Sequence, residues 1–169
     1  MSISNGEFSI KQRIDVIKSF CVASNIEVTQ IKEDKTISFV EFDILFKEQA
    51  YKLFLYPKNI VDSGWSNKPH IKRIQIKAFN TIPENKEGNL CALVGICNGD
   101  NGPVLAFWNP FLYTFHKKNR SGYLLLEQLE EADESGFLET EYADKKILIC
   151  SSTSFDKLLD RYIEKNYID

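Results

Sequence analysis

The sequence predicts a mainly β fold with peripheral helices (α+β), in which seven or eight strands form a small open β-barrel. Many short segments of the 169-residue chain alternate apolar and polar residues, as half-buried strands do. The stretch "CNGDNG", between two apolar runs, carries the Asn-Gly signal of a β-hairpin. Apolar stripes at helical spacing occur near both ends of the chain and in one short central segment. We therefore expect one domain, residues 1–169, with N-terminal, short central and C-terminal helices around the barrel.

Each predicted helix has its own start or stop signal. A capping box that begins at Ser9 starts the N-terminal helix. Gly136 ends the short central helix, which is expected over residues 126–135. Thr153 and Asp156 form a second capping-box pattern, directly before the apolar stripe of the C-terminal helix.

Eight alternating runs predict the strands. They begin at Thr36, Ala50, His70, Leu90, Pro103, Tyr123, Leu138 and Lys145. In the first run, "TISFVEFDILF", the alternation slips by one residue near Val40–Glu41, which predicts a β-bulge there. The second run, "AYKLFLY", is expected to pair with the first across the short "KEQ" turn.

The composition favours a soluble, cytoplasmic protein. Hydrophobic residues make up 43% and charged residues 27% of the chain, as in ordinary globular domains. No apolar run approaches the roughly 20 residues of a membrane span, and the first residues lack the pattern of a signal peptide. The four cysteines have no CxxC spacing and sit among apolar neighbours, so we expect buried, reduced thiols.

The charge distribution tells more than the net charge of −3. Residues 58–77 hold five Lys or Arg and the single acid Asp62, and residues 101–126 hold three cations and no acid. By contrast, residues 127–144 hold eight acids and no base. Two basic segments in an otherwise acidic chain predict one positive face.

The sequence lacks the residue patterns of a metal site, a nucleotide-binding site and a cysteine nucleophile. His70 and His116 are far apart without flanking cysteines, so no metal site is expected. No phosphate-binding glycine motif of the nucleotide-binding folds occurs, and no cofactor is expected. A cysteine nucleophile needs a polar, electropositive setting, which none of the four cysteines has.

A divalent-metal nuclease remains an alternative. Such enzymes often combine an acid with a (D/E)-x-K triplet on the next strand, and here Asp62 precedes Gln75-Ile76-Lys77. Gln is a poorer metal ligand than a carboxylate. The second triplet, Glu33–Lys35, has the letters of the motif but is expected to form a polar turn.

The two basic segments point instead to nucleic acid. Each mixes Lys or Arg with Ser, Asn, His and an aromatic residue. Cations and small polar donors suit phosphate contacts, whereas Arg, Asn and Gln suit base edges in the major groove.

The order of three stretches, "SGWSNKPHIKRIQI", "LCALVGICNGDNGPVLAFWNP" and "FHKKNRSGYLLLEQLEEADESGF", resembles the DNA-binding domains of restriction systems. The similarity is to the N-terminal target-recognition domain of LlaJI-type, McrBC-related restriction proteins, a B3-like DNA-binding pseudobarrel, and it covers roughly residues 50–150. The resemblance implies two arms that grip duplex DNA from the major groove, at Ser63–Arg73 and Tyr113–Ser121. In such systems a motor domain with a Walker motif and a separate nuclease subunit act with the recognition domain. Because the Walker motif is absent here, we expect a non-catalytic recognition module. This module is either a fragment of a larger restriction protein or a free-standing protein.

The resemblance assigns DNA contacts to both arms. In the first arm and its following strand the candidates are Ser63, Trp65, Ser66, Asn67, Lys68, His70, Lys72, Arg73 and Lys77. In the second arm they are Tyr113, His116, Lys117, Lys118, Asn119, Arg120 and Ser121. The lysines are expected on phosphates, and Arg73, Arg120, Asn67 and Asn119 on bases.

Two questions stay open at this level. Trp65 either packs against the DNA or anchors its loop to the barrel. A barrel that binds RNA or flips a modified base into an aromatic pocket is a further alternative, with Trp65 beside Tyr113 or Phe115.

Overall fold

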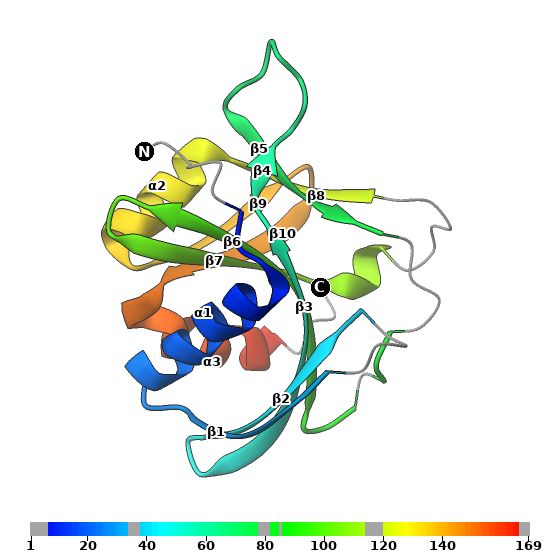
Figure 1. Ribbon diagram of the computed structural model, residues 1–169, viewed down its shortest axis with the longest axis vertical. Helices are drawn as coiled ribbons and strands as arrows, with labels where there is room; N and C mark the ends of the chain where they lie inside the picture. The colour runs from blue at the N-terminus through cyan, green and yellow to red at the C-terminus, as the bar shows by residue number, and fades with distance from the viewer. Residues whose placement is uncertain (1–6, 34–37, 78–81, 85, 114–119, 166–169) are drawn as a thin grey trace.

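A computed structural model describes residues 7–33, 38–77, 82–84, 86–113 and 120–165. Within these residues ten strands form two sheets, and three α-helices pack against them (Figure 1). The helices are α1 (Ile10–Ala23), α2 (Leu126–Ser135) and α3 (Phe155–Lys165). The strands are β1 (Glu27–Glu33), β2 (Val40–Phe46), β3 (Gln49–Asn59), β4 (Val61–Asp62), β5 (Ile71–Ile76), β6 (Asn89–Gly99), β7 (Gly102–Trp108), β8 (Arg120–Leu125), β9 (Phe137–Tyr142) and β10 (Lys145–Ser151). The prediction of a mainly β protein with three helices is confirmed.

The larger sheet has seven strands in the order β1-β2-β3-β6-β7-β10-β9, and the smaller has the order β4-β5-β8. All neighbours are antiparallel except β3 and β6, which run parallel. The chain passes from one sheet to the other at Ile60, a buried residue between β3 and β4 whose N–H donates to the carbonyl of Ile96 (2.8 Å). In the described part of the chain no hydrogen-bonded ladder joins β8 to β9, so a closed barrel is not confirmed.

Two hydrophobic cores lie on the two faces of the larger sheet. One face packs against α1 and α3, with Phe20 and Phe155 in edge-to-face contact (ring centroids 6.0 Å apart). The other face packs against the smaller sheet and α2. Helices α1 and α3 bury their apolar stripes on the first face, whereas α2 buries Leu129 and Ala132 on the second face, in the core shared with the smaller sheet.

Trp108 fills the space between the sheets. Its side chain is 1% exposed, and it sits between Gly95 of β6 and Gly122 of β8. A Cβ at Gly95 would lie 2.9 Å from Cζ3 of the indole, and one at Gly122 would lie 3.3 Å from its Cε2. The two glycines therefore make room for the largest side chain of the core.

Most helix signals are confirmed. Ser9 and Gln12 form the predicted capping box, and Gly136 ends α2 with a φ of 92°. The predicted cap at Thr153 is wrong. A 3₁₀ turn (Ser152–Ser154) precedes α3, and the N–H of Asp156 donates to the hydroxyl of Ser24 (3.3 Å), at the end of α1.

The strand predictions need three corrections. Strands β1 and β4 were not predicted, and the strand expected from Tyr123 begins at Arg120 and ends before α2 starts at Leu126. The bulge is not in β2 but in its partner β1, where the register shifts between Val28 and Gln30. The parity slip near Val40 arises because Phe39 precedes the strand and faces the second core, whereas Val40 faces the first.

Candidate nucleic-acid interface

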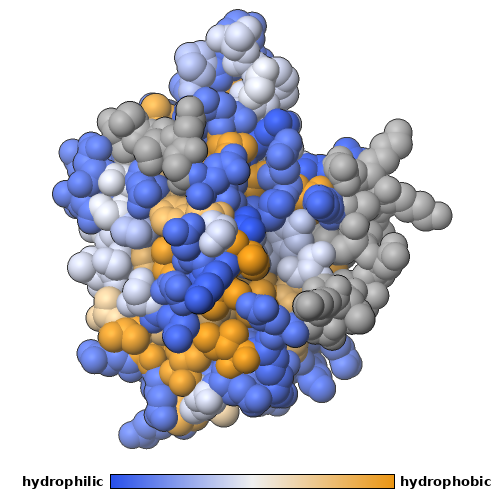
Figure 2. All heavy atoms as spheres, viewed as in Figure 1, coloured by the Kyte–Doolittle hydropathy of each residue, from blue (hydrophilic) through white to orange (hydrophobic). Residues whose placement is uncertain are grey.

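The β4–β5 connection projects from the body of the protein as a hairpin tip (Figure 1). Residues 64–70 are all exposed, and the tip is coloured hydrophilic to neutral in Figure 2. Ser63, at its base, is buried, and its hydroxyl accepts a hydrogen bond from the N–H of Trp65 (3.2 Å). The first-arm candidates Trp65, Ser66, Asn67, Lys68 and His70 therefore lie together on an exposed loop.

Trp65 is fixed to the smaller sheet. Its indole stacks on the ring of Tyr123 with centroids 5.2 Å apart and an interplanar angle of 15°. The ammonium of Lys68 lies 5.4 Å from the indole centroid, and Tyr123 contacts Tyr142 of β9 (6.3 Å). These contacts favour the anchoring role for Trp65.

The alternation of β5 divides its cations between two faces. Lys72 shares the inner face with Ile74 and Ile76; its residue is 8% exposed, and its ammonium pairs with Asp62. Lys72 is thus held by a partner within the protein.

Arg73, Gln75 and Lys77 take the opposite face of β5 and line an open hollow of about 640 Å³, to which residues of both sheets contribute. Its lining residues are Lys58, Arg73, Gln75, Ile76, Lys77, Tyr113, Arg120, Ser121, Tyr123, Ala143 and Lys145. Five of these described residues are cations and none is an acid. The antiparallel register of β5 and β8 places Arg73 opposite Tyr123 and Gln75 opposite Ser121.

The guanidinium of Arg73 reaches toward the projecting loop. A Cβ built on Gly64, which has a φ of 87°, would lie 3.6 Å from an Nη atom of Arg73. The Nε of Arg73 is buried and has no hydrogen-bond partner within the described chain. An arginine with unused donors at the edge of a cationic hollow is suited to an anionic or base-edge ligand.

Only part of the second arm lies among the described residues. Tyr113 is 5% exposed at the end of a 3₁₀ turn, Pro110–Tyr113; burial raises its pKa, and the ammonium of Lys145 lies 5.0 Å from its ring centroid. Arg120 and Ser121 begin β8 and reach the hollow. The remaining second-arm candidates lie outside the described residues: His116, Lys117, Lys118 and Asn119.

Four lining residues with polar side chains were missed as DNA-binding candidates, namely Lys58, Gln75, Tyr123 and Lys145. The basic composition of residues 58–77 was a usable signal for Lys58, and the alternation of β5 was one for Gln75. No local sequence pattern indicates that Lys145 belongs to the hollow, since it directly follows an acidic stretch. Lys145 reaches the hollow because the β9–β10 hairpin forms the far side of the hollow.

The nuclease pattern is not assembled. Asp62 faces Lys72 on one side of the smaller sheet, whereas Gln75 and Lys77 face the other. Within the described ranges no group of three or more His, Cys, Asp or Glu residues is arranged to hold a metal ion.

The four cysteines are free and buried, as predicted. Burial raises the pKa of Cys21 and of Cys97 to about 12, so neither thiol forms the thiolate that a nucleophile requires near neutral pH.

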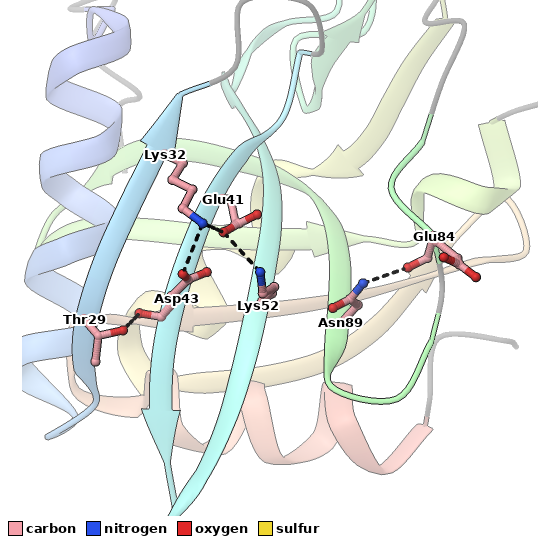
Figure 3. A network of polar contacts seen from close by, with 7 residues as sticks. All are labelled: Thr29, Lys32, Glu41, Asp43, Lys52, Glu84 and Asn89. Carbon is pink, nitrogen blue, oxygen red and sulfur yellow. Dashed lines mark hydrogen bonds and ion pairs between the residues drawn. The ribbon is translucent and has the colours of Figure 1, made fainter.

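A second charged cluster, on β1, β2 and β3, carries both signs (Figure 3). The ammonium of Lys32 lies 3.2 Å from Glu41 and 3.8 Å from Asp43, and that of Lys52 lies 3.8 Å from Glu41. Burial and the neighbouring Glu41 raise the pKa of Asp43. This cluster is internally compensated, whereas the described lining of the basic hollow contains cations and no acid.

An acidic hollow of about 400 Å³ lies elsewhere on the protein, beside α2 and the β6–β7 turn. Its buried carboxylate, Asp133, accepts hydrogen bonds from the N–H groups of Asp100 (3.0 Å) and Asn101 (3.3 Å). Asp133 therefore fixes that hairpin turn, and the acidic and basic hollows are built from different elements.

Residues 51–157 match the family model of the methylase-associated X1 domain, which covers more than half of the chain. The chain belongs to the methylase-associated X1 family. This family is associated with restriction–modification systems, in agreement with the context that the resemblance implied. The B3-like and LlaJI-type details of that resemblance are not confirmed.

The methylase-associated X1 match contains every lining residue of the basic hollow, whereas α1, β1 and β2 precede it. No curated protein and no solved structure matches the chain. None of the described helices is long and apolar enough to cross a membrane.

Proposed function

We propose that this protein binds double-stranded DNA through the basic hollow and the projecting β4–β5 loop, and recognises a target site for a restriction–modification system. One observation carries the proposal: five cations and no acid line the hollow, in a chain whose net charge is −3. Concentrated positive charge in a hollow attracts a polyanion, and the methylase-associated family supplies the DNA context.

The lining side chains divide by chemistry. Lys58, Lys77 and Lys145 are point charges suited to phosphates. Arg73, Gln75 and Arg120 carry the planar guanidinium and amide groups that read guanine and adenine edges in the major groove. The exposed Asn67 and Lys68 extend the same chemistry onto the loop tip.

The arrangement of the strands supports a B3-like pseudobarrel. Strand β3 continues into β4, so the smaller sheet follows on from the larger one, and its last strand β8 lies beside β9. The start of β8, which follows the second arm in the sequence, lines the hollow, and the β4–β5 loop is joined to the same strand by the stack of Trp65 on Tyr123.

The chain would act as the recognition module of a larger machine. We propose that it is itself non-catalytic and that partner domains or subunits supply nucleotide hydrolysis and cleavage. In this proposal the chain itself reads the double-stranded DNA target.

Selection of binding sites from a random duplex pool, methylated and unmethylated, tests the proposal. We expect enrichment of one motif by the unsubstituted protein and loss of enrichment by the double variant Arg73→Gln, Arg120→Gln. The double variant Lys18→Gln, Lys157→Gln, with exposed changes on α1 and α3, is the charge-matched control. Failure to enrich any motif, or displacement of duplex by single-stranded RNA at equal concentration, would count against target-site recognition.

A further inference from the structure

A second, smaller hollow of about 200 Å³ adjoins the basic hollow on the side of α1. Its lining residues are Glu7, Phe8, Arg13, Lys58, Asn59, Val61 and Gln75. Lys58 and Gln75 line both hollows, so the two form one continuous depression. The added cation, Arg13, comes from α1, which lies outside the segment that matches the family model.

The N-terminal segment is held in place beside this hollow. The N–H of Phe8 donates to Oδ1 of Asn59 (3.0 Å), and Nδ2 of Asn59 donates to the carbonyl of Phe8 (2.9 Å). The carbonyl of Ser9 then accepts from the N–H of Arg13 (2.9 Å) in the first turn of α1. These bonds fix the start of α1 against the end of β3, where Lys58 stands.

The cations of this region face one another with little compensation. Burial lowers the pKa of Lys58, and repulsion from Arg13 and Lys77 lowers it further. The Nε of Arg13 is buried and has no hydrogen-bond partner within the described residues. Glu7 is the single acid among the described lining residues of the two hollows. A bound anion would relieve the repulsion between the cations and use the spare donors.

We infer that the phosphate-binding track continues from the basic hollow over Lys58 to Arg13, so that α1 holds the backbone of the same DNA duplex. This inference rests on the proposed function and extends it to an element that the family match does not include. A phosphate contact gives no base specificity, so Arg13 would contribute equally to every DNA sequence.

The experiment measures the affinity of the full chain for a mixed-sequence duplex over a range of salt concentrations. The slope of log K against log salt is negative, and each lost phosphate contact makes it less steep by about 0.9. We expect that change for Arg13→Gln and for Lys58→Gln. Arg13→Lys should keep the slope, and Lys18→Gln, an exposed change on the same helix, should leave it unchanged.

A second variant keeps the test independent of the half-buried Arg13. Glu7 is exposed, and Glu7→Gln removes the acid of the smaller hollow, so we expect duplex affinity at low salt to rise about two- to fivefold. Unchanged affinity in Glu7→Gln, or Arg13→Gln behaving as Lys18→Gln does while Arg73→Gln weakens binding, overturns the extension to α1 alone. Absence of duplex binding by the unsubstituted protein overturns both this inference and the proposed function.

Discussion

The indole of Trp65 stacks on the phenol ring of Tyr123, with centroids 5.2 Å apart and planes within 15° of parallel. Trp65 belongs to the exposed loop, whereas Tyr123 belongs to β8 and stands opposite Arg73 in the sheet. The stack therefore joins the projecting loop to the strands that line the basic hollow. An ordered loop loses less conformational entropy when it binds a ligand.

Removing this stack should weaken DNA binding without unfolding the protein. Aromatic pairs contribute about 0.5–1.5 kcal/mol beyond their buried area, and Trp65 is 44% exposed. We expect Trp65→Ala to lower duplex affinity and to speed amide hydrogen exchange in residues 64–70, while Trp65→Phe retains both. The free energy of unfolding of Trp65→Ala should fall by no more than the contribution of the aromatic pair, about 0.5–1.5 kcal/mol. If Trp65→Ala loses affinity but leaves loop exchange unchanged, Trp65 contacts DNA directly.

The proposed base contacts of Arg73 and Arg120 make a separate prediction. A bidentate arginine contact discriminates against a wrong base by about 1–3 kcal/mol, and a lysine at the same place keeps the charge but loses the fork. Arg73→Lys and Arg120→Lys should therefore keep non-specific affinity and relax the selected motif at one position each. Binding to the selected site and to single-base variants of it measures this. An equal loss on all sequences would place the arginine on a phosphate.

The sequence was informative wherever a local signal decides the structure. The capping box at Ser9 and the glycine after α2 act within one turn of helix, and both ends were predicted correctly. The β2–β3 pairing was also predicted, although its turn residues Lys47 and Glu48 both take positive φ without the usual Asn-Gly.

Strand β1 shows why other elements were missed. Only Val28 and Ile31 of this edge strand are partly buried, and the bulge between Val28 and Gln30 breaks the period of two. The composition of the hollow was out of reach for a different reason. Lys58 and Lys145 meet only because two distant hairpins lie on either side of the same space.

Lys72 is the instructive case within the site. The alternation that put Ile74 and Ile76 on one face of β5 also puts Lys72 there, and that signal was available in the sequence. The family resemblance and the charge composition together placed Lys72 among the expected phosphate contacts. Strand parity, applied to every residue of the basic segment, separates the buried, paired Lys72 from Arg73 and Lys77.

Gly95 should tolerate no side chain. A Cβ there would lie 2.7 Å from Cγ1 of Ile60 and 2.9 Å from Cζ3 of Trp108, both of them buried core residues. Overpacking of this kind costs about 1–3 kcal/mol, so we expect Gly95→Ala to lower the free energy of unfolding by that amount in urea denaturation. The cost should shrink in an Ile60→Ala background, since the closest contact is then gone. An equal cost in both backgrounds would mean that Ile60 is not the obstacle.

The last prediction concerns Glu139, which joins β9 to α3. Its carboxylate accepts from Nε (2.7 Å) and Nη2 (3.1 Å) of Arg161 and lies 2.6 Å from the ammonium of Lys165. Hydrogen bonds from these two partners lower the pKa of Glu139 from 4.5 to about 2. Because the folded pKa is the lower one, the stabilisation is present above pH 4.5 and is lost as the pH falls toward 2.

Glu139→Gln should remove this pH-dependent part. With the side chain 32% exposed and screened by solvent, we expect about 1 kcal/mol less stability than the unsubstituted protein above pH 5, and a difference that narrows toward pH 2. Urea denaturation at a series of pH values measures the difference directly. Glu48→Gln, on the exposed turn after β2, is the control and should track the unsubstituted protein throughout. A Glu139→Gln difference that stays constant down to pH 2 would mean that the ion pairs with Arg161 and Lys165 are not its source.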